Sequence, residues 1–122
     1  MTVQEVLRQL DRLCPNQYDD AQKLLWLSAL EGQLYGEIAA QHTATARLTP
    51  PVTLTARTVL LAPDPYAGLY VDYLRARIAQ ANNETERCND AAADFQAGLR
   101  NWWSACTRAS LPVAKAARLR VM

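Results

Sequence analysis

The chain of 122 residues has few of the residue types that build catalytic or metal centres. It holds one histidine, His42, and three cysteines, Cys14, Cys88 and Cys106, which lie far apart and form no CxxC pair. Zinc sites need three or four ligands, and a cysteine or serine nucleophile needs a neighbouring base or positive charge. The sequence therefore predicts no catalytic residue, no metal and no cofactor. His42 is expected at the surface, and the cysteines are expected as free thiols in a reducing compartment.

Long apolar runs and glycine-rich loops are also lacking. No apolar run approaches the ~20 residues of a membrane span, and the first residues lack the basic and apolar regions of a signal peptide. None of the four glycines belongs to a phosphate-binding loop. Gly32 and Gly36 lie four residues apart in a predicted helix, so another helix could approach closely at this face. The alternative is that the two glycines make no helix contact. Neither membrane insertion nor nucleotide binding is predicted.

Acidic residues are missing from the C-terminal part of the chain. Residues 1–94 hold all twelve acids and eight bases, a net charge of −4, whereas residues 95–122 hold five bases and no acid, a net charge of +5. This distribution suits an acidic partner surface, head-to-tail self-association or nucleic acid, and it is also typical of a solvated basic tail. The five bases are Arg100, Arg108, Lys115, Arg118 and Arg120.

Two amphipathic helices are predicted in the first 40 residues. Thr2 and Glu5 form a capping box before apolar residues at helical spacing, and Pro15 ends this helix near Cys14. Asp19 is a candidate N-cap for a second helix that runs to about residue 40. Capping and the helix dipole account for Asp19 and Asp20, so a pair of catalytic carboxylates is the less favoured interpretation.

Residues 41–63 differ in composition from the predicted helices. They hold six threonines, three prolines and no acid. Apolar and polar residues alternate over 52–57, which predicts a strand, and residues 59–61 are either a second short strand or a buried extended segment. The segment is therefore expected as a small β-hairpin or as a long extended loop, and a loop of this length often has a function.

The remaining chain predicts two further helices. Asp64 and Pro65 are expected to begin the third, and Asn83 is expected to cap the fourth, with Glu86 in the box position. A heptad-like seam in the fourth helix predicts an antiparallel pairing of these two helices. Trp103 points away from this seam, toward either another subunit or another helix of the same chain. The seam consists of Cys88, Ala92, Phe95, Leu99, Trp102, Cys106 and Ala109.

The fold class that follows is mainly α: a four-helix, bundle-like domain over residues 1–110, with the loop or hairpin at 41–63. Residues 111–122 form a separate, basic C-terminal arm.

Residues 60–74 carry a pattern, LL.P.PY..LY..YL, that resembles small structural proteins of tailed phages and prophages. Further stretches are similar to the same group over nearly the whole chain. The chain departs from the group at Ala67 and Gly68, where acids are frequent, and at Cys88, where an aromatic is frequent. The matching stretches are residues 15–18 with Lys23, Trp26 and Leu27; residues 81–84 with Arg87 and Asn89; and Trp103, Thr107 and Arg108 before Leu111 and Pro112.

These proteins resemble phage head–tail connectors, also called head completion or neck adaptor proteins. The resemblance implies a helical bundle with an extended loop that forms a ring, typically of twelve subunits, beneath the portal. The ring extends the DNA channel, meets non-specific DNA transiently and offers a surface to a downstream neck or tail-completion protein. The expected location is the virion neck, and the host cytoplasm during assembly. The isolated chain is expected as a ring or as a monomer that assembles on its partner.

Two groups of contact residues follow as hypotheses. The C-terminal arm is expected to dock to the portal. A second group, in the loop region 43–58 and on the fourth helix, is expected at a subunit interface or at the channel. The alternative is a small helical nucleic-acid-binding protein, a regulator or a DNA-packaging subunit, whose C-terminal bases bind phosphates. The portal-docking group is Leu111, Pro112, Lys115, Arg118, Leu119 and Arg120, and the interface group is Arg47, Thr53, Thr55, Arg57 and Trp103.

Overall fold

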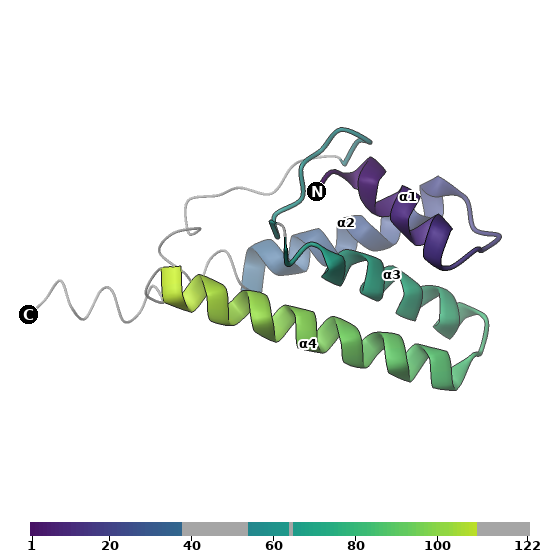
Figure 1. The fold of residues 1–122 in the computed structure, drawn as a ribbon. Helices are drawn as coiled ribbons and strands as arrows, with labels where there is room; N and C mark the ends of the chain where they lie inside the picture. Colours follow the sequence, from purple (N-terminus) through teal and green to yellow (C-terminus); the bar gives the residue numbers. More distant parts are fainter. Residues whose placement is uncertain (38–53, 64, 110–122) are drawn as a thin grey trace, which may run out of the picture.

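The computed structural model of the chain describes residues 1–37, 54–63 and 65–109 (Figure 1). These residues form four helices and no strand, which confirms a mainly helical, bundle-like fold. The helices are α1 (Val3–Leu13), α2 (Asp20–Glu37), α3 (Gly68–Ala81) and α4 (Thr85–Ala109).

Helix α3 is the centre of the bundle. It contacts each of the other three helices, with α4 on one side and α1 and α2 on the other (Figure 1). Its side chains Leu69, Tyr70, Leu74 and Ile78 are buried, and they join the apolar faces of α1 and α2 in one core. From α4, Trp102 is buried in the same core, so the predicted seam of α4 packs inward at this position.

The first two helices begin where the sequence predicts. The Glu5 N–H donates to Thr2 Oγ1 at 3.3 Å, and the Gln22 N–H donates to Asp19 Oδ1 at 2.9 Å. Both bonds satisfy donors that a helix leaves unpaired in its first turn. Helix α1 ends at Leu13, before Cys14 and Pro15, as predicted. The predicted end of the second helix near residue 40 lies outside the described residues.

Residues 54–63 form a loop that covers the N-terminus of α1. The N–H groups of Val3 and Gln4 donate to the carbonyls of Thr58 and Ala56, both at 3.0 Å. Thr2 and Val59 form an isolated antiparallel bridge. The loop thus supplies acceptors for first-turn donors of α1 that Thr2 alone cannot satisfy.

The predicted strand over 52–57 is not confirmed for its described part. Residues 56 and 57 are in a turn, in which the Thr58 N–H donates to the Thr55 carbonyl at 3.1 Å and the Thr55 N–H donates to Thr58 Oγ1 at 2.9 Å. Threonine hydroxyls compete in this way with the pairing of strands. Leu54 and Leu60 are nevertheless buried, as expected for apolar residues of this segment. The rest of the predicted hairpin, residues 41–53, lies outside the described residues.

The third helix begins later than predicted. Asp64 lies outside the described residues, and residues 65–67 are in turns that precede Gly68. The Tyr66 N–H donates to the Pro63 carbonyl and the Tyr70 N–H to the Ala67 carbonyl, at 2.8 and 3.1 Å. These i to i+3 bonds make a tighter turn than an α-helix, and they delay its start.

Helices α3 and α4 form the predicted antiparallel hairpin (Figure 1). The prediction that Asn83 caps α4 is wrong. Asn83 takes a left-handed conformation with φ 58° and reverses the chain before α4 begins. Asparagine favours both positions, so its presence alone does not distinguish them. A Cβ added at Gly98 would lie 3.4 Å from Leu69 Cβ, so the two helices approach closely there.

Candidate functional site

The residues predicted to contact partners fall on separate parts of the chain. The whole portal-docking group, with Arg47 and Thr53 of the interface group, lies outside the described residues. Thr55 and Arg57 are exposed in the loop on α1, whereas Trp103 is 41 % exposed on the C-terminal half of α4. Trp103 follows the buried Trp102, as the 100° step of a helix predicts. The described members of the interface group therefore come from two different elements.

The cysteines and paired glycines fit their simpler interpretations. Cys14, Cys88 and Cys106 are half-buried, and none of the three is joined in a disulfide. Burial raises the pKa of the Cys106 thiol, which disfavours the thiolate that a nucleophile needs. Added Cβ atoms at Gly32 and Gly36 meet nothing within 4 Å, so no described helix approaches them. Among described residues, no group of three or more His, Cys, Asp or Glu is placed to hold a metal.

A buried acid on α2 organises the loop, and no pattern in the sequence predicts it. Glu31 is only 2 % exposed. Its Oε1 accepts from the Tyr70 hydroxyl at 2.8 Å, and its Oε2 accepts from the Leu61 N–H at 2.9 Å. The Tyr70 oxygen in turn accepts from the Ala62 N–H at 2.9 Å. Two side chains from α2 and α3 thus bind consecutive amides of the loop.

Burial sets the titration of this network. Desolvation raises the pKa of Glu31, and the bonds from Leu61 and Tyr70 oppose that rise. Desolvation and the adjacent Glu31 raise the pKa of Tyr70, which therefore stays a hydroxyl donor. Because both groups are enclosed in the core and fully hydrogen-bonded, the arrangement holds the loop in place and does not present a reactive group to a substrate.

A second buried charge joins α1 to α2. Lys23 is 3 % exposed, and its Nζ lies 2.7 Å from Asp11 Oδ1. Asn16 Nδ2 also donates to Asp11 Oδ1, at 3.3 Å. The pair fixes the angle between the two helices at the turn that follows α1.

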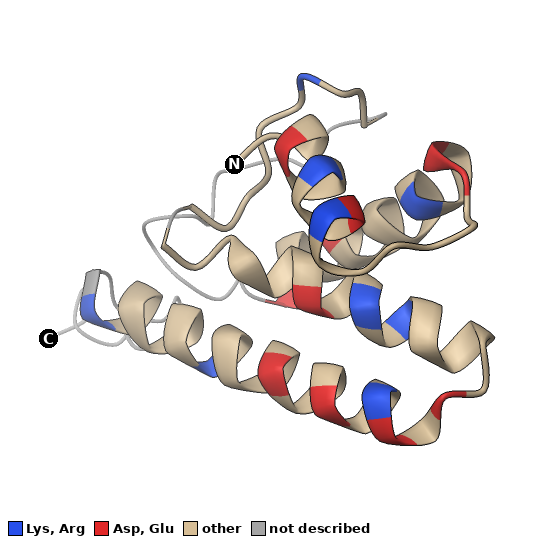
Figure 2. Cartoon of the chain, turned by 45° about the vertical axis from the view of Figure 1, so that its right-hand side comes forward, with Lys and Arg blue, Asp and Glu red and all other residues tan. Residues whose placement is uncertain are grey.

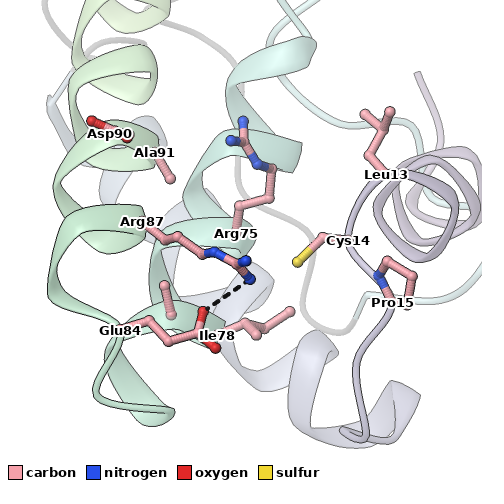
Figure 3. Close-up of a pocket in the computed structure, with 10 residues that line it drawn as sticks. Leu13, Cys14, Pro15, Arg75, Ile78, Glu84, Arg87, Asp90 and Ala91 are labelled. Carbon is pink, nitrogen blue, oxygen red and sulfur yellow. Dashed lines mark hydrogen bonds and ion pairs between the residues drawn. The ribbon is translucent and has the colours of Figure 1, made fainter.

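A groove lies between the end of α1 and the α3–α4 hairpin (Figure 3). Its cavity volume is about 380 Å³, within the size range of ligand and peptide pockets. The floor is apolar, since Ile78, Ala79 and Ala91 are buried. Leu13, by contrast, is 62 % exposed on the wall that α1 provides. Ten residues line the groove: Leu13, Cys14, Pro15, Arg75, Ile78, Ala79, Glu84, Arg87, Asp90 and Ala91.

Charged side chains form the rim of this groove. Arg75 lies 2.9 Å from Asp72 and 3.7 Å from Asp94, and Arg87 lies 3.5 Å from Glu84. Asp90 forms no ion pair with a residue that the structure describes. Both arginines are therefore already matched by carboxylates, and Asp90 leaves the rim with unbalanced negative charge.

The charges of α4 are segregated along its length (Figure 2). Residues 84–94 carry four acids and Arg87, a net charge of −3, whereas residues 95–109 carry Arg100 and Arg108 and no acid. The groove lies at the acidic end of this helix (Figure 2), and the basic end is followed in the sequence by residues 110–122.

Comparisons with family models, with curated proteins and with solved structures gave no match for this chain. None of the helices in the described part of the chain is long and apolar enough to cross a membrane.

Proposed function

We propose that the chain is a structural assembly subunit of the phage head–tail connector type. One observation carries the proposal: the pattern on which the resemblance rests contributes several buried side chains to the core. Leu60, Leu69 and Leu74 are at most 3 % exposed, and Tyr70 is fully buried and bonded to Glu31. A pattern made of core-forming residues marks a shared fold more strongly than one made of surface residues.

The distribution of charge also supports an assembly role. A helix that is acidic at one end and basic at the other favours head-to-tail contacts between copies, and such heterologous contacts close into a ring when the rotation divides the circle. The ring would sit beneath the portal in the virion neck, around the DNA channel, and bind a downstream neck or tail-completion protein.

The finer assignments belong to this proposal. Residues 41–63 act as an extended loop or small hairpin at a subunit interface or the channel, with Arg47, Thr53, Thr55 and Arg57. Trp103 serves the same interface from α4. Residues 111–122 form the arm that docks to the portal, while residues 1–110 fold as the bundle.

The test compares the full chain with a variant that lacks residues 111–122, each mixed with the portal protein of the same gene cluster. The full chain should co-purify with the portal. The shortened variant should keep its helical circular dichroism and lose portal binding. Unfolding of the shortened variant would contradict a separate arm, and failure of the full chain to bind at micromolar concentration would contradict the connector role.

A DNA mobility shift of the full chain examines the nucleic-acid alternative. Six phosphate contacts would lower affinity by about a thousandfold between 50 and 200 mM salt. Tight binding with such a slope would replace the connector proposal by a DNA-binding role.

A further inference from the structure

We propose that the groove between α1 and the α3–α4 hairpin is a docking site for the C-terminal segment, residues 110–122, of a second copy of this chain. The site and its occupant lie at opposite ends of α4, so docking joins the copies head to tail. The inference goes beyond the connector role, because it requires no portal and concerns contacts between copies.

The groove combines the two features that an apolar, basic peptide requires. Its floor of Ile78, Ala79 and Ala91 is apolar, and Leu13 exposes most of its side chain beside it. Its rim is negative, because Arg75 and Arg87 are matched by carboxylates while Asp90 is not. Apolar contact would come mainly from Leu13, since Ile78, Ala79 and Ala91 are at most 4 % exposed, and the rim charge would select the sign of the partner.

The C-terminal segment has the complementary composition. Residues 110–122 carry Lys115, Arg118 and Arg120 and no acid, a net charge of +3 against −3 for residues 84–94. Leucines and valines are interspersed with these bases.

Distance favours a second copy over the chain's own groove. Asp90 and Ala109 are 19 residues apart in α4, so the groove lies about 29 Å from the start of the segment. An extended chain spans at most about 3.6 Å per residue, so Lys115 reaches no further than roughly 22 Å from Ala109. Only the last few residues could fold back onto the same molecule, whereas the whole segment is available to another copy.

The same segment is assigned to the portal under the proposed function, so the two uses alternate on any one copy. The segment of one copy binds the groove of another, either between free copies or between neighbours in a ring. The portal would then compete with the groove for the segment. The test below contains no portal, so its outcome is independent of the connector role.

The experiment uses two full-length variants with opposite charge changes. Asp90→Lys makes the rim of the groove positive, and Arg118→Glu with Arg120→Glu makes the segment negative. Sedimentation velocity over a concentration series gives the association constant of each. Reversal of one exposed pair changes affinity by about fivefold, so each variant alone should associate at least that much more weakly than the wild type.

Mixing the two variants gives the decisive result. The unaltered segment of the Asp90→Lys protein fits the unaltered groove of the other variant, so the mixture should associate more strongly than either protein alone. Glu37→Lys is the control, because it changes the net charge as Asp90→Lys does but lies at the end of α2 and does not line the groove. The control should associate like the wild type.

The thiol of Cys14 provides a local readout, since it points into the groove (Figure 3). Its alkylation rate, followed by mass spectrometry of its peptide, should fall as the wild-type protein associates and should stay constant in the Asp90→Lys variant. Circular dichroism confirms that each variant is folded. A wild type that stays monomeric, a mixture that fails to associate, or Cys14 alkylation that is independent of concentration would each overturn the proposal.

Discussion

Replacing Tyr70 with phenylalanine tests whether the buried network holds the loop on the bundle. The change removes one oxygen from a fully buried ring and leaves the packing of the ring intact. The Ala62 N–H then loses its acceptor, and Glu31 loses one of its two donors.

The magnitude follows from these two losses. A buried donor without a partner costs about 1–3 kcal/mol, and the lost bond to the acid adds about 1 kcal/mol. Tyr70→Phe should therefore lower the free energy of unfolding by about 2–4 kcal/mol, a large part of the 5–15 kcal/mol typical of a domain.

The assay is urea unfolding at pH 7, followed by far-ultraviolet circular dichroism. Tyr73→Phe is the matched control. The centroid of the Tyr73 ring lies 5.4 Å from that of Phe95, and the Tyr73 hydroxyl bonds to no residue that the structure describes. The control should stay within about 0.5 kcal/mol of the wild type, as surface-like changes do. A Tyr70→Phe variant as stable as the control would refute the role assigned to the network.

Three further predictions concern buried charge and helix propensity. Burial raises the pKa of Glu31 above its ordinary 4.5, so the folded state holds this proton more tightly. As pH rises from about 4.5 through the folded-state pKa, urea unfolding should therefore show the wild type losing stability relative to Glu31→Gln; parallel curves would contradict this. Asp11→Asn leaves the Lys23 ammonium buried without its carboxylate, and because the Asp11 side chain is 52 % exposed the cost should be about 1–2 kcal/mol, whereas Lys23→Met should be nearly neutral in the same assay. Equal losses would contradict the pairing argument. Gly32→Ala should raise the free energy of unfolding by about 1 kcal/mol and with it the melting temperature, since nothing lies within 4 Å of the new Cβ. A lower melting temperature would indicate a contact there.

Local signals in the sequence were sufficient for the helices. The caps at Thr2 and Asp19, the proline after Cys14 and the seam of α4 each act within one or two turns, so spacing alone predicts them. The start of α3 was predicted too early, because i to i+3 turns after Pro63 satisfy the same N–H groups as a helix would.

The network and the groove were beyond local signals. In the sequence, Glu31 is an acid next to the leucines of a predicted helix, and nothing there distinguishes it from a surface acid. Only the tertiary fold brings the Leu61 amide and the Tyr70 hydroxyl to it. The groove combines α1 with the α3–α4 hairpin, which are more than 50 residues apart in the chain. Leu13 and Asp90 line the same groove only because these elements pack together.

The central claim is that this chain is an assembly subunit, and its native mass tests that claim most directly. Light scattering and negative-stain microscopy would be applied to the full chain, alone and mixed with the portal of the same gene cluster. The account predicts rings, either of the chain alone or on the portal. A chain that stays monomeric and ignores the portal at micromolar concentration would contradict it.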